Sequence, residues 1–272
     1  MDGYPDVMSE EFEKPFRPLL IGRGRLARHL HHLLTLREIP HSIHEEARQL
    51  LSPNTIDDPW FREEASLCTH IWLLVSDQAL LPLSRMLREQ LPCTPLLHSS
   101  AATPVPDAVT LHPLMTFGPA LYEEETYDRI PLTLFREELE HSPRTADRLQ
   151  LEGFLSRLAN PVRILSSAER TRYHLSCVMY SNLSLLLWEA ARRSAPPSLS
   201  VRDFEPILLQ TLLNFFDSGL SALTGPLARG DTPTIEAHLG ALATGPEREL
   251  YDAFVRYFEN RKKEAPHADH RP

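Results

Sequence analysis

Residues 17–27 read Arg17-Pro18-Leu19-Leu20-Ile21-Gly22-Arg23-Gly24-Arg25-Leu26-Ala27. The apolar run before the first glycine is typical of a short buried strand, and the two glycines follow it directly. Leucines then recur at helical spacing, at positions Leu26, Leu30, Leu33 and Leu34. The stretch therefore predicts a strand, a glycine turn and a helix, in that order.

The turn carries the pattern Gly22-x-Gly24-x-x-Ala27, which between a strand and a helix is typical of a dinucleotide-binding site. The first glycine permits the tight turn, the second lets the backbone approach a pyrophosphate, and the small third residue lets helix and strand pack closely. Amide groups at the start of the helix then face the phosphates. A tight turn without a ligand is the alternative. We expect a dinucleotide to contact the turn residues Gly22, Arg23, Gly24, Arg25, Leu26 and Ala27.

The alternation of strands and helices continues to about residue 167. Residues 52–66 are rich in turn formers. Alternating strands and helices indicate βαβ units, so we expect an α/β fold with a Rossmann domain and a mostly parallel sheet over residues 17–167. Apolar runs predict further strands over 39–44, 71–75, 96–98, 109–112, 130–135 and 162–165, and helical patterns cover 76–91 and 145–158.

After residue 167 only helical patterns remain. We therefore expect an all-α domain over residues 168–262, preceded in the chain by an acidic arm (1–16) and followed by a polar tail (263–272). The helical patterns cover 168–193, 203–218, 233–243 and 247–261.

Composition argues against several classes of protein. The net charge of −9 leaves no basic excess to meet phosphate, so we expect neither a nucleic-acid nor a membrane partner. The longest charge-free apolar stretch, between Arg172 and Glu189, is shorter than the about 20 residues of a membrane span. The acidic N-terminus does not resemble a signal peptide. Three cysteines without a C-x-x-C pair predict neither a disulfide framework nor a zinc site, which favours a cytoplasmic protein.

The choice between NAD and NADP stays open. An acid about 20 residues after the glycines would bind a ribose 2′-hydroxyl, whereas an arginine would suit a 2′-phosphate. Glu45 and Glu46 stand at that distance, while Arg23, Arg25 and Arg48 favour the phosphate. The alternative is that all five are solvated surface charges.

Five stretches together resemble one known family. They are residues 21–27, Leu73-Leu74-Val75-Ser76-Asp77, His98-Ser99-Ser100-Ala101, Leu111-His112-Pro113-Leu114-Met115-Thr116-Phe117, and a C-terminal set of Tyr173-His174, Ser181-Asn182, Leu223-Thr224-Gly225-Pro226-Leu227-Ala228-Arg229-Gly230-Asp231 and His238-Leu239. On these residues the chain resembles the Rossmann-like oxidoreductases whose C-terminal half is a domain of unknown function, DUF2520. These are relatives of pyrroline-5-carboxylate reductase and of the deazaflavin-dependent NADP reductases.

This resemblance implies a Rossmann domain followed by an all-helical dimerisation domain, a homodimer, bound NADP(H), and oxidation or reduction of a small metabolite. Two departures are visible. His44-Glu45-Glu46 stands where such proteins commonly have the arginine and serine that read a 2′-phosphate, so NAD remains open as the cofactor. Residues 134–137 replace the glycine-and-acid turn expected after the sixth strand.

Polar residues follow three of the predicted strands at their carboxyl ends, where an open α/β sheet binds its ligand. We expect the cofactor to contact those after the third and fourth strands, and the substrate to contact those after the fifth. Strand-end histidines also cap loops, which is the alternative for both histidines of this set. The residues are Val75, Ser76, His98 and Ser99 for the cofactor, and His112 and Thr116 for the substrate.

His174 is the first candidate for the proton step of a hydride transfer, because the unperturbed pKa of histidine is about 6.5. It opens the helix beside the expected crevice, Ser181 lies two helical turns further along the same face, and Asn182 follows. A hydroxyl and an amide beside an imidazole could orient a carbonyl or imine. A buried structural histidine is the alternative.

Arg229 is the candidate for binding a substrate carboxylate or a cofactor phosphate. It lies on a turn marked by Gly225 and Gly230, and Thr232 is the expected N-cap of the following helix. The alternative is an ion pair with Asp231 that fixes the turn.

These features predict an NAD(P)-dependent oxidoreductase that acts on a small imino, keto or hydroxy acid. The competing hypothesis is a nucleotide-binding regulatory protein without turnover, favoured by the lack of a lysine in the helix over 168–193. His29, His31 and His32 lack an acid or cysteine partner, so no metal site is expected. The sequence has no G-x-S-x-G elbow and no P-loop, which argues against hydrolases and NTPases.

Overall fold

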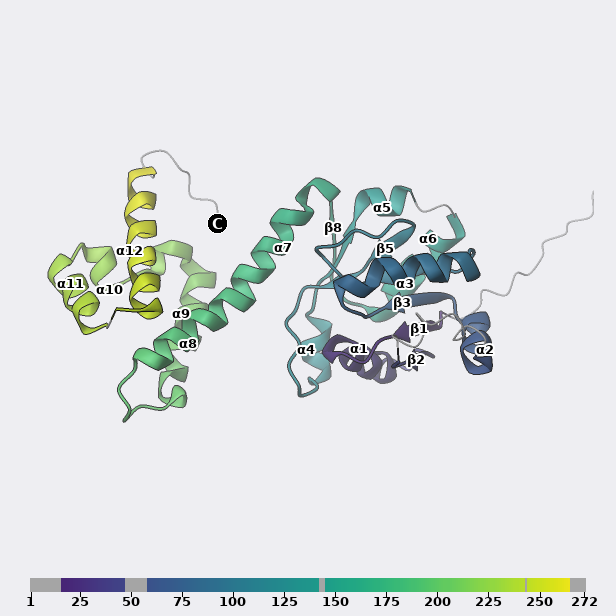
Figure 1. The fold of residues 1–272 in the computed structure, drawn as a ribbon, viewed down its shortest axis with the longest axis horizontal. Coiled ribbons are helices and arrows are strands. Elements are labelled where there is room, and N and C mark those ends of the chain that lie inside the picture. Colours follow the sequence, from purple (N-terminus) through teal and green to yellow (C-terminus); the bar gives the residue numbers. More distant parts are fainter. Residues whose placement is uncertain (1–15, 47–57, 142–144, 243, 265–272) are drawn as a thin grey trace, which may run out of the picture. The chain divides into compact units, whose positions relative to one another are not determined.

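The computed structural model describes residues 16–46, 58–141, 145–242 and 244–264 of the 272-residue chain (Figure 1). The chain divides into two compact units, one ending at Met179 and the other beginning at Tyr180. The expected acidic arm and polar tail lie almost entirely outside the described residues.

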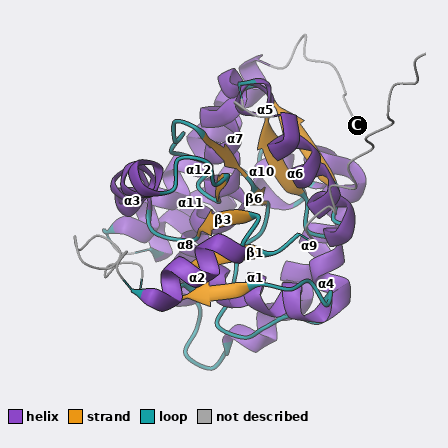
Figure 2. Ribbon diagram, turned by 90° about the vertical axis from the view of Figure 1, so that its right-hand side faces the viewer, coloured by secondary structure: helices purple, strands orange, loops and turns teal. Residues whose placement is uncertain are grey.

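The first unit is built on a five-stranded parallel sheet with the strand order β2-β1-β3-β4-β5. Figure 2 shows these strands in orange. Because β2 and β3 flank β1 on opposite sides, the strand order reverses at β1, and ligands of open α/β sheets bind at the carboxyl edge of such a switch point. The strands are β1 (Pro18–Ile21), β2 (Ser42–His44), β3 (His70–Leu73), β4 (Leu96–His98) and β5 (Ala108–Thr110).

Helices cover both faces of this sheet, which explains why its strands are continuously apolar. Leu20 of β1 belongs to a core cluster with residues of α1 (Arg25–Leu36) and α6 (Thr145–Leu158). Leu19 and Ile21 belong to a second cluster, with residues of α2 (Pro59–Leu67) and α3 (Asp77–Gln90). All three β1 side chains are fully buried, and each contributes about 1.5–3 kcal/mol through removal from water.

A second, three-stranded sheet contains β6 (His112–Pro113), β7 (Leu132–Phe135) and β8 (Val162–Leu165). β6 is antiparallel to β7, and β7 is parallel to β8. The short helices α4 (Glu124–Asp128) and α5 (Arg136–Glu140) precede and follow β7. The expected α/β fold class is confirmed, but the single strand expected over 109–112 is wrong, since these residues contribute to two strands in two sheets.

The interpretation of residues 52–66 as turns is wrong for their second half, which begins helix α2. The Asp58 side chain accepts a hydrogen bond from the Trp60 amide and caps the helix, and Pro59 occupies its first position. Phe61 and Ala65, one turn apart, bury the inner face. The residues that suggested turns are therefore the start signals of a helix.

The second unit is all helical over its described residues. The helix expected over 168–193 consists of α7 (Arg170–Val178), a π-helical segment (Met179–Leu183) and α8 (Ser184–Ser194), and its first part belongs to the first unit. The N-cap of α11 is Asp231 rather than the expected Thr232, because the Asp231 carboxylate accepts the Thr234 amide. The remaining helices of this unit are α9 (Glu205–Ser218), α10 (Gly225–Arg229), α11 (Thr232–Ala241) and α12 (Pro246–Glu264), with 3₁₀ turns at Val201–Phe204 and Gly219–Ala222. In the first unit, a 3₁₀ turn at Ser167–Glu169 precedes α7.

Candidate functional site

The turn after β1 requires glycine at its first position. Gly22 has a φ of +146°, and a Cβ atom there would lie 2.2 Å from the carbonyl oxygen of Leu74. The Gly22 amide donates to the His44 carbonyl oxygen at 2.9 Å, which ties the turn to the end of β2. Gly22 therefore lets β1, β2 and the segment after β3 approach one another at the switch point.

Gly24 has a different role, because its surroundings are open. It is the N-cap residue of α1 and provides no side-chain cap, and a Cβ atom at this position would meet no protein atom within 4 Å. The first amides of α1 thus lack a capping side chain, while Ala27 is fully buried against the sheet. An uncapped helix start beside open space fits the diphosphate of a dinucleotide.

A cavity of about 250 Å³ lies at this switch point. Its lining includes five of the residues predicted to contact the cofactor, and both acids that bear on the choice between NAD and NADP. Arg23 and Glu46, which both line the cavity, form an exposed ion pair of 3.2 Å. Arg25 is exposed in the first turn of α1, and Arg48 lies outside the described residues. The lining residues are Gly22, Arg23, Gly24, Glu45, Glu46, Leu74, Val75, Ser76, Ala79 and Leu83.

His98 and Ser99 have side chains that bond within the protein. His98 is fully buried; its Nδ1 accepts the Ser100 amide at 3.3 Å, and its Nε2 lies 3.1 Å from Thr110 Oγ1. Burial, helped by the nearby Arg170, lowers the pKa of His98 to about 4. Ser99 Oγ accepts from the Trp72 indole and donates to the Leu111 carbonyl oxygen, both at 2.9 Å. These side chains hold β4 to β5, so we leave His98 out of the proposed cofactor contacts.

His112 bonds to a residue that was not among the predicted site residues. Its Nδ1 lies 2.7 Å from the hydroxyl of Tyr173, which donates to Thr133 Oγ1 at 3.0 Å. Burial and the nearby His174 lower the pKa of His112 to about 4. Thr116, on the loop after β6, is exposed, and its carbonyl oxygen accepts the hydroxyl of Tyr122 at 2.8 Å.

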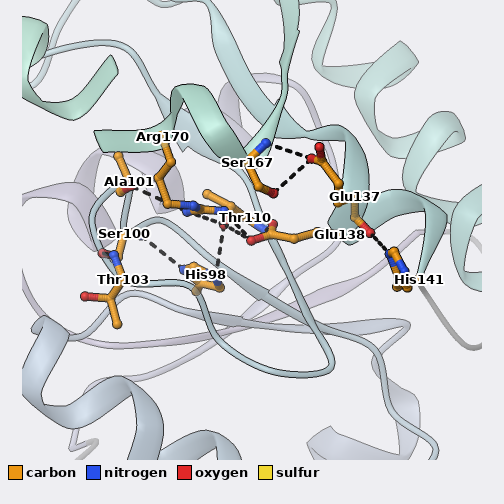
Figure 3. Close-up of polar contacts among 10 residues, drawn as sticks. All are labelled: His98, Ser100, Ala101, Thr103, Thr110, Glu137, Glu138, His141, Ser167 and Arg170. Atoms are coloured by element: carbon orange, nitrogen blue, oxygen red, sulfur yellow. Dashed lines mark hydrogen bonds and ion pairs between the residues drawn. The ribbon is translucent and has the colours of Figure 1, made fainter. Parts of the chain in front are cut away.

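The start of α7 is anchored by a buried ion pair between Arg170 and Glu138 (Figure 3). The Arg170 guanidinium also lies 3.6 Å from the centroid of the Phe135 ring and donates to Thr110 Oγ1. Glu138 in turn accepts the Thr110 amide at 2.7 Å. This anchor joins α5, β5 and α7 and fixes the turn of α7 that carries Tyr173.

The remaining predicted residues are placed as follows. His174 is half-buried and makes no hydrogen bond to any residue that the structure describes. Ser181 and Asn182 lie on the π-helical segment, where Ser181 Oγ donates to Asn182 Oδ1 at 2.6 Å. The α-helical spacing that placed Ser181 on the face of His174 does not apply through this segment. They belong to the second unit, so their convergence with His174 stays a prediction.

Arg229 is exposed at the end of α10, and its guanidinium lies 3.8 Å from the Asp231 carboxylate. The ion pair weighed as the alternative is thus present, while Asp231 is chiefly engaged as the cap of α11.

Among the described residues no group of three His, Cys, Asp or Glu side chains could hold a metal ion. No described helix is both long and apolar enough to cross a membrane.

Residues 140–258, from just before α6 into α12, match the family model described as a domain of unknown function, DUF2520. This part of the chain is similar to the DUF2520 domain. The resemblance to DUF2520 inferred from the sequence is thereby confirmed, and the matched residues include Tyr173, His174, Ser181, Asn182 and Arg229. No curated protein sequence matches the chain.

Solved structures match nearly the whole chain, DUF2520 domain included. BF3122 from Bacteroides fragilis, provisionally named an NADP oxidoreductase, has a TM-score of 0.69 at 20% identity over 91% of this chain and 99% of its own. Protein TM1727 from Thermotoga maritima has a TM-score of 0.61 at 18% identity, over 92% and 100%. An imine reductase from Streptomyces aurantiacus has a TM-score of 0.54 at 14% identity, over 90% and 95%. These likenesses establish a shared fold.

Proposed function

We propose that the protein is an NAD(P)-dependent oxidoreductase acting on a small imino, keto or hydroxy acid. The observation that carries this proposal is the pair of glycines at the switch point. Gly22 closes the turn against Leu74, and Gly24 leaves open space in front of the uncapped start of α1. The names of BF3122 and of the imine reductase support the same class of reaction.

The cofactor we propose is NADP(H), with NAD(H) as the alternative. Arg23 stands at the cavity beside the expected adenosine ribose, where its guanidinium could pair with a 2′-phosphate. Glu46 competes for that guanidinium through the 3.2 Å ion pair, and Glu45 adds a second negative charge to the lining. These acids favour NAD(H), so the balance between Arg23 and Glu46 decides the preference.

The substrate is expected beyond the carboxyl ends of the strands, near His112 and Thr116. When bound, the nicotinamide supplies or accepts the hydride of the reaction. His174 has no competing hydrogen bond within the described chain, so its imidazole is open to a ligand. We infer that Asn182 and Ser181 orient the carbonyl or imine and that Arg229 binds a substrate carboxylate, since its contact with Asp231 is long enough to exchange.

We infer that the protein is a homodimer held together by the helical unit. α9 is apolar around most of its circumference, and Ile207, Leu213 and Phe216 are all exposed. A groove of about 630 Å³ between α8 and α9 has a mostly apolar lining, although Glu189 and Arg192 also contribute to it. Monomers rarely expose apolar patches beyond a few hundred Å². We expect sedimentation analysis to give a dimer and Phe216→Glu to dissociate it; a monomeric wild-type protein would contradict the inference.

We further infer a cytoplasmic location, because no disulfide joins the three cysteines, all of which lie in described segments.

The experiment that tests the proposed function measures consumption of NADPH and NADH over a panel of small imino and keto acids, and the reverse reaction with hydroxy and amino acids. His174→Ala and Asn182→Ala should each lower turnover at least about 100-fold, the usual contribution of general acid–base catalysis. Dinucleotide binding without turnover on any panel member would indicate the regulatory alternative.

A further inference from the structure

The loop from Leu114 to Tyr122, which follows β6, is closed by the hydroxyl of Tyr122. This hydroxyl donates to the Thr116 carbonyl oxygen and accepts from the Gly118 amide, both at 2.8 Å. Both directions are fixed, because a main-chain carbonyl oxygen can only accept and a main-chain amide can only donate. One hydroxyl therefore holds the main chain on both sides of Phe117.

His29 of α1 docks this loop onto the sheet domain. Its Nε2 donates to the Gly118 carbonyl oxygen at 3.0 Å, and its Nδ1 lies 2.7 Å from the hydroxyl of Tyr127 on α4. The Tyr122 amide donates to the same hydroxyl at 3.3 Å. The His29 ring also packs against the rings of Phe117 and Tyr122, with centroids 4.9 and 4.5 Å away. Polar and aromatic contacts thus attach the loop to α1.

The residues behind the loop are buried and held in place. His29 and Tyr127 are each 1% exposed, so their hydrogen bond forms away from water, where it is electrostatically stronger. Burial raises the pKa of Tyr127, so its hydroxyl keeps its proton at neutral pH. Asn160 donates to the main-chain carbonyl oxygen of Tyr127 at 2.6 Å. Helix α4 lies beside α1 (Figure 1), and Arg37 of α1 pairs with Glu124 of α4 at 3.1 Å.

The same contacts leave the side chain of Thr116 open to a ligand. Thr116 is exposed, and its hydroxyl makes no hydrogen bond to any residue that the structure describes. The loop follows β5 and β6, beyond the carboxyl edge of the parallel sheet, where open α/β sheets bind their ligands. His29 lies only about 7.5 Å along the axis of α1 from Gly24, at a rise of 1.5 Å per residue. The loop that carries Thr116 is therefore anchored near the glycine turn.

We propose that Tyr122 is a positioning residue, which holds the loop so that the Thr116 hydroxyl forms a hydrogen bond to a polar group of the substrate. This inference rests on the proposed oxidoreductase function. It assigns no proton transfer to Tyr122 or Thr116, and His174 keeps that role. Without the Tyr122 hydroxyl, the Thr116 carbonyl and the Gly118 amide lose the partner they share, and the Thr116 hydroxyl is no longer held in place.

A double-mutant cycle in kcat/KM separates positioning from a general structural role. Thr116→Ala should lower kcat/KM about tenfold, the upper range for one neutral hydrogen bond. Tyr122→Phe keeps the ring and should lower kcat/KM about fivefold alone, but less than about 1.5-fold when Thr116 is already alanine. The dissociation constant of the dinucleotide should stay within about twofold in both variants. Effects that multiply in the double variant, or wild-type kcat/KM in Thr116→Ala, would overturn the proposal.

Hydrogen exchange gives a second readout that needs no substrate. The Gly118 amide should exchange about tenfold faster in Tyr122→Phe, because it loses its acceptor. Tyr257→Phe is the matched control, since it removes an exposed hydroxyl from α12, and it should change neither exchange nor kinetics. An unchanged exchange rate in Tyr122→Phe would refute the role of Tyr122. If the cycle fails while the wild type turns over, only this inference falls; if the wild type has no turnover, the proposed function falls with it.

Discussion

Replacement of Gly24 by alanine separates ligand binding from folding. Because a Cβ atom at this position meets no protein atom within 4 Å and the residue has a φ of −69°, Gly24→Ala should fold normally. Alanine is a poorer N-cap than glycine, which destabilises the folded protein, but it also lowers the conformational entropy of the unfolded chain, which stabilises the folded protein. These two effects nearly cancel, so the free energy of unfolding should stay within about 1 kcal/mol of the wild-type value. The added methyl group would instead occupy the space that we assign to the diphosphate.

The expected loss of affinity follows from the hydrogen bonds that the methyl group displaces. Hydrogen bonds from amides to a charged group contribute about 1.5–3 kcal/mol each. Losing one of them weakens dinucleotide binding by roughly 10- to 150-fold, which calorimetric or fluorescence titration with NADPH resolves.

Two further glycine variants complete this experiment. Gly153→Ala makes the same substitution in α6, where a Cβ atom also meets nothing, and should leave affinity unchanged. Gly22→Ala should destabilise the fold by about 2–4 kcal/mol, because of its positive φ and the contact with Leu74. Wild-type affinity in Gly24→Ala would refute the reasoning, since it would mean that no diphosphate approaches this turn.

Three other perturbations test other parts of the first unit. Glu46→Ser removes a negative charge and releases Arg23, so the ratio of NADPH to NADH affinity should rise about tenfold, and an unchanged ratio would exclude Glu46 from cofactor choice. Glu138→Gln leaves the buried Arg170 guanidinium without its carboxylate and should lower the free energy of unfolding in urea by about 3 kcal/mol. The control Glu46→Gln removes an exposed ion pair and should lower it by less than about 1 kcal/mol. Equal effects of the two substitutions would contradict the role of the buried ion pair as an anchor. His98 has a folded pKa of about 4, below its unfolded value near 6.5, so the unfolded chain takes up the proton first as pH falls. Its contribution is full above pH 6.5 and is lost towards pH 4, by up to about 3 kcal/mol, and His98→Asn should flatten this pH dependence of the unfolding free energy; the same slope in both proteins would disprove the assignment.

Local signals were sufficient to predict the glycine turn. The apolar run of β1, the two glycines and the leucine spacing of α1 stand next to one another in the chain, so the strand, the turn and the helix are all found as expected. The start of α2 was missed for an equally local reason. Asp58 and Pro59 begin a helix as readily as they form a turn, and only the burial of Phe61 distinguishes the two outcomes.

The surroundings of His112 depend on contacts between distant segments. Tyr173 and His112 lie 61 positions apart, and their hydrogen bond joins α7 to β6. The sequence suggested His112 and His174 as site residues and marked the Tyr173-His174 pair as part of the family resemblance, but no local signal indicated the contact between His112 and Tyr173. His98 shows the converse: its position at a strand end suggested a ligand contact, but Thr110 on the neighbouring strand takes up its Nε2. Tertiary packing therefore decides whether a histidine at a strand end bonds within the protein or keeps a ring nitrogen for a ligand.

The most direct test of dinucleotide binding is calorimetric titration of the wild-type protein with NADPH and, in parallel, NADH. Saturable binding of one dinucleotide per chain, weakened by Gly24→Ala and unaffected by Gly153→Ala, is the expected result. No heat and no displacement of a fluorescent analogue with either dinucleotide would contradict the assignment of the open space at Gly24 to a diphosphate.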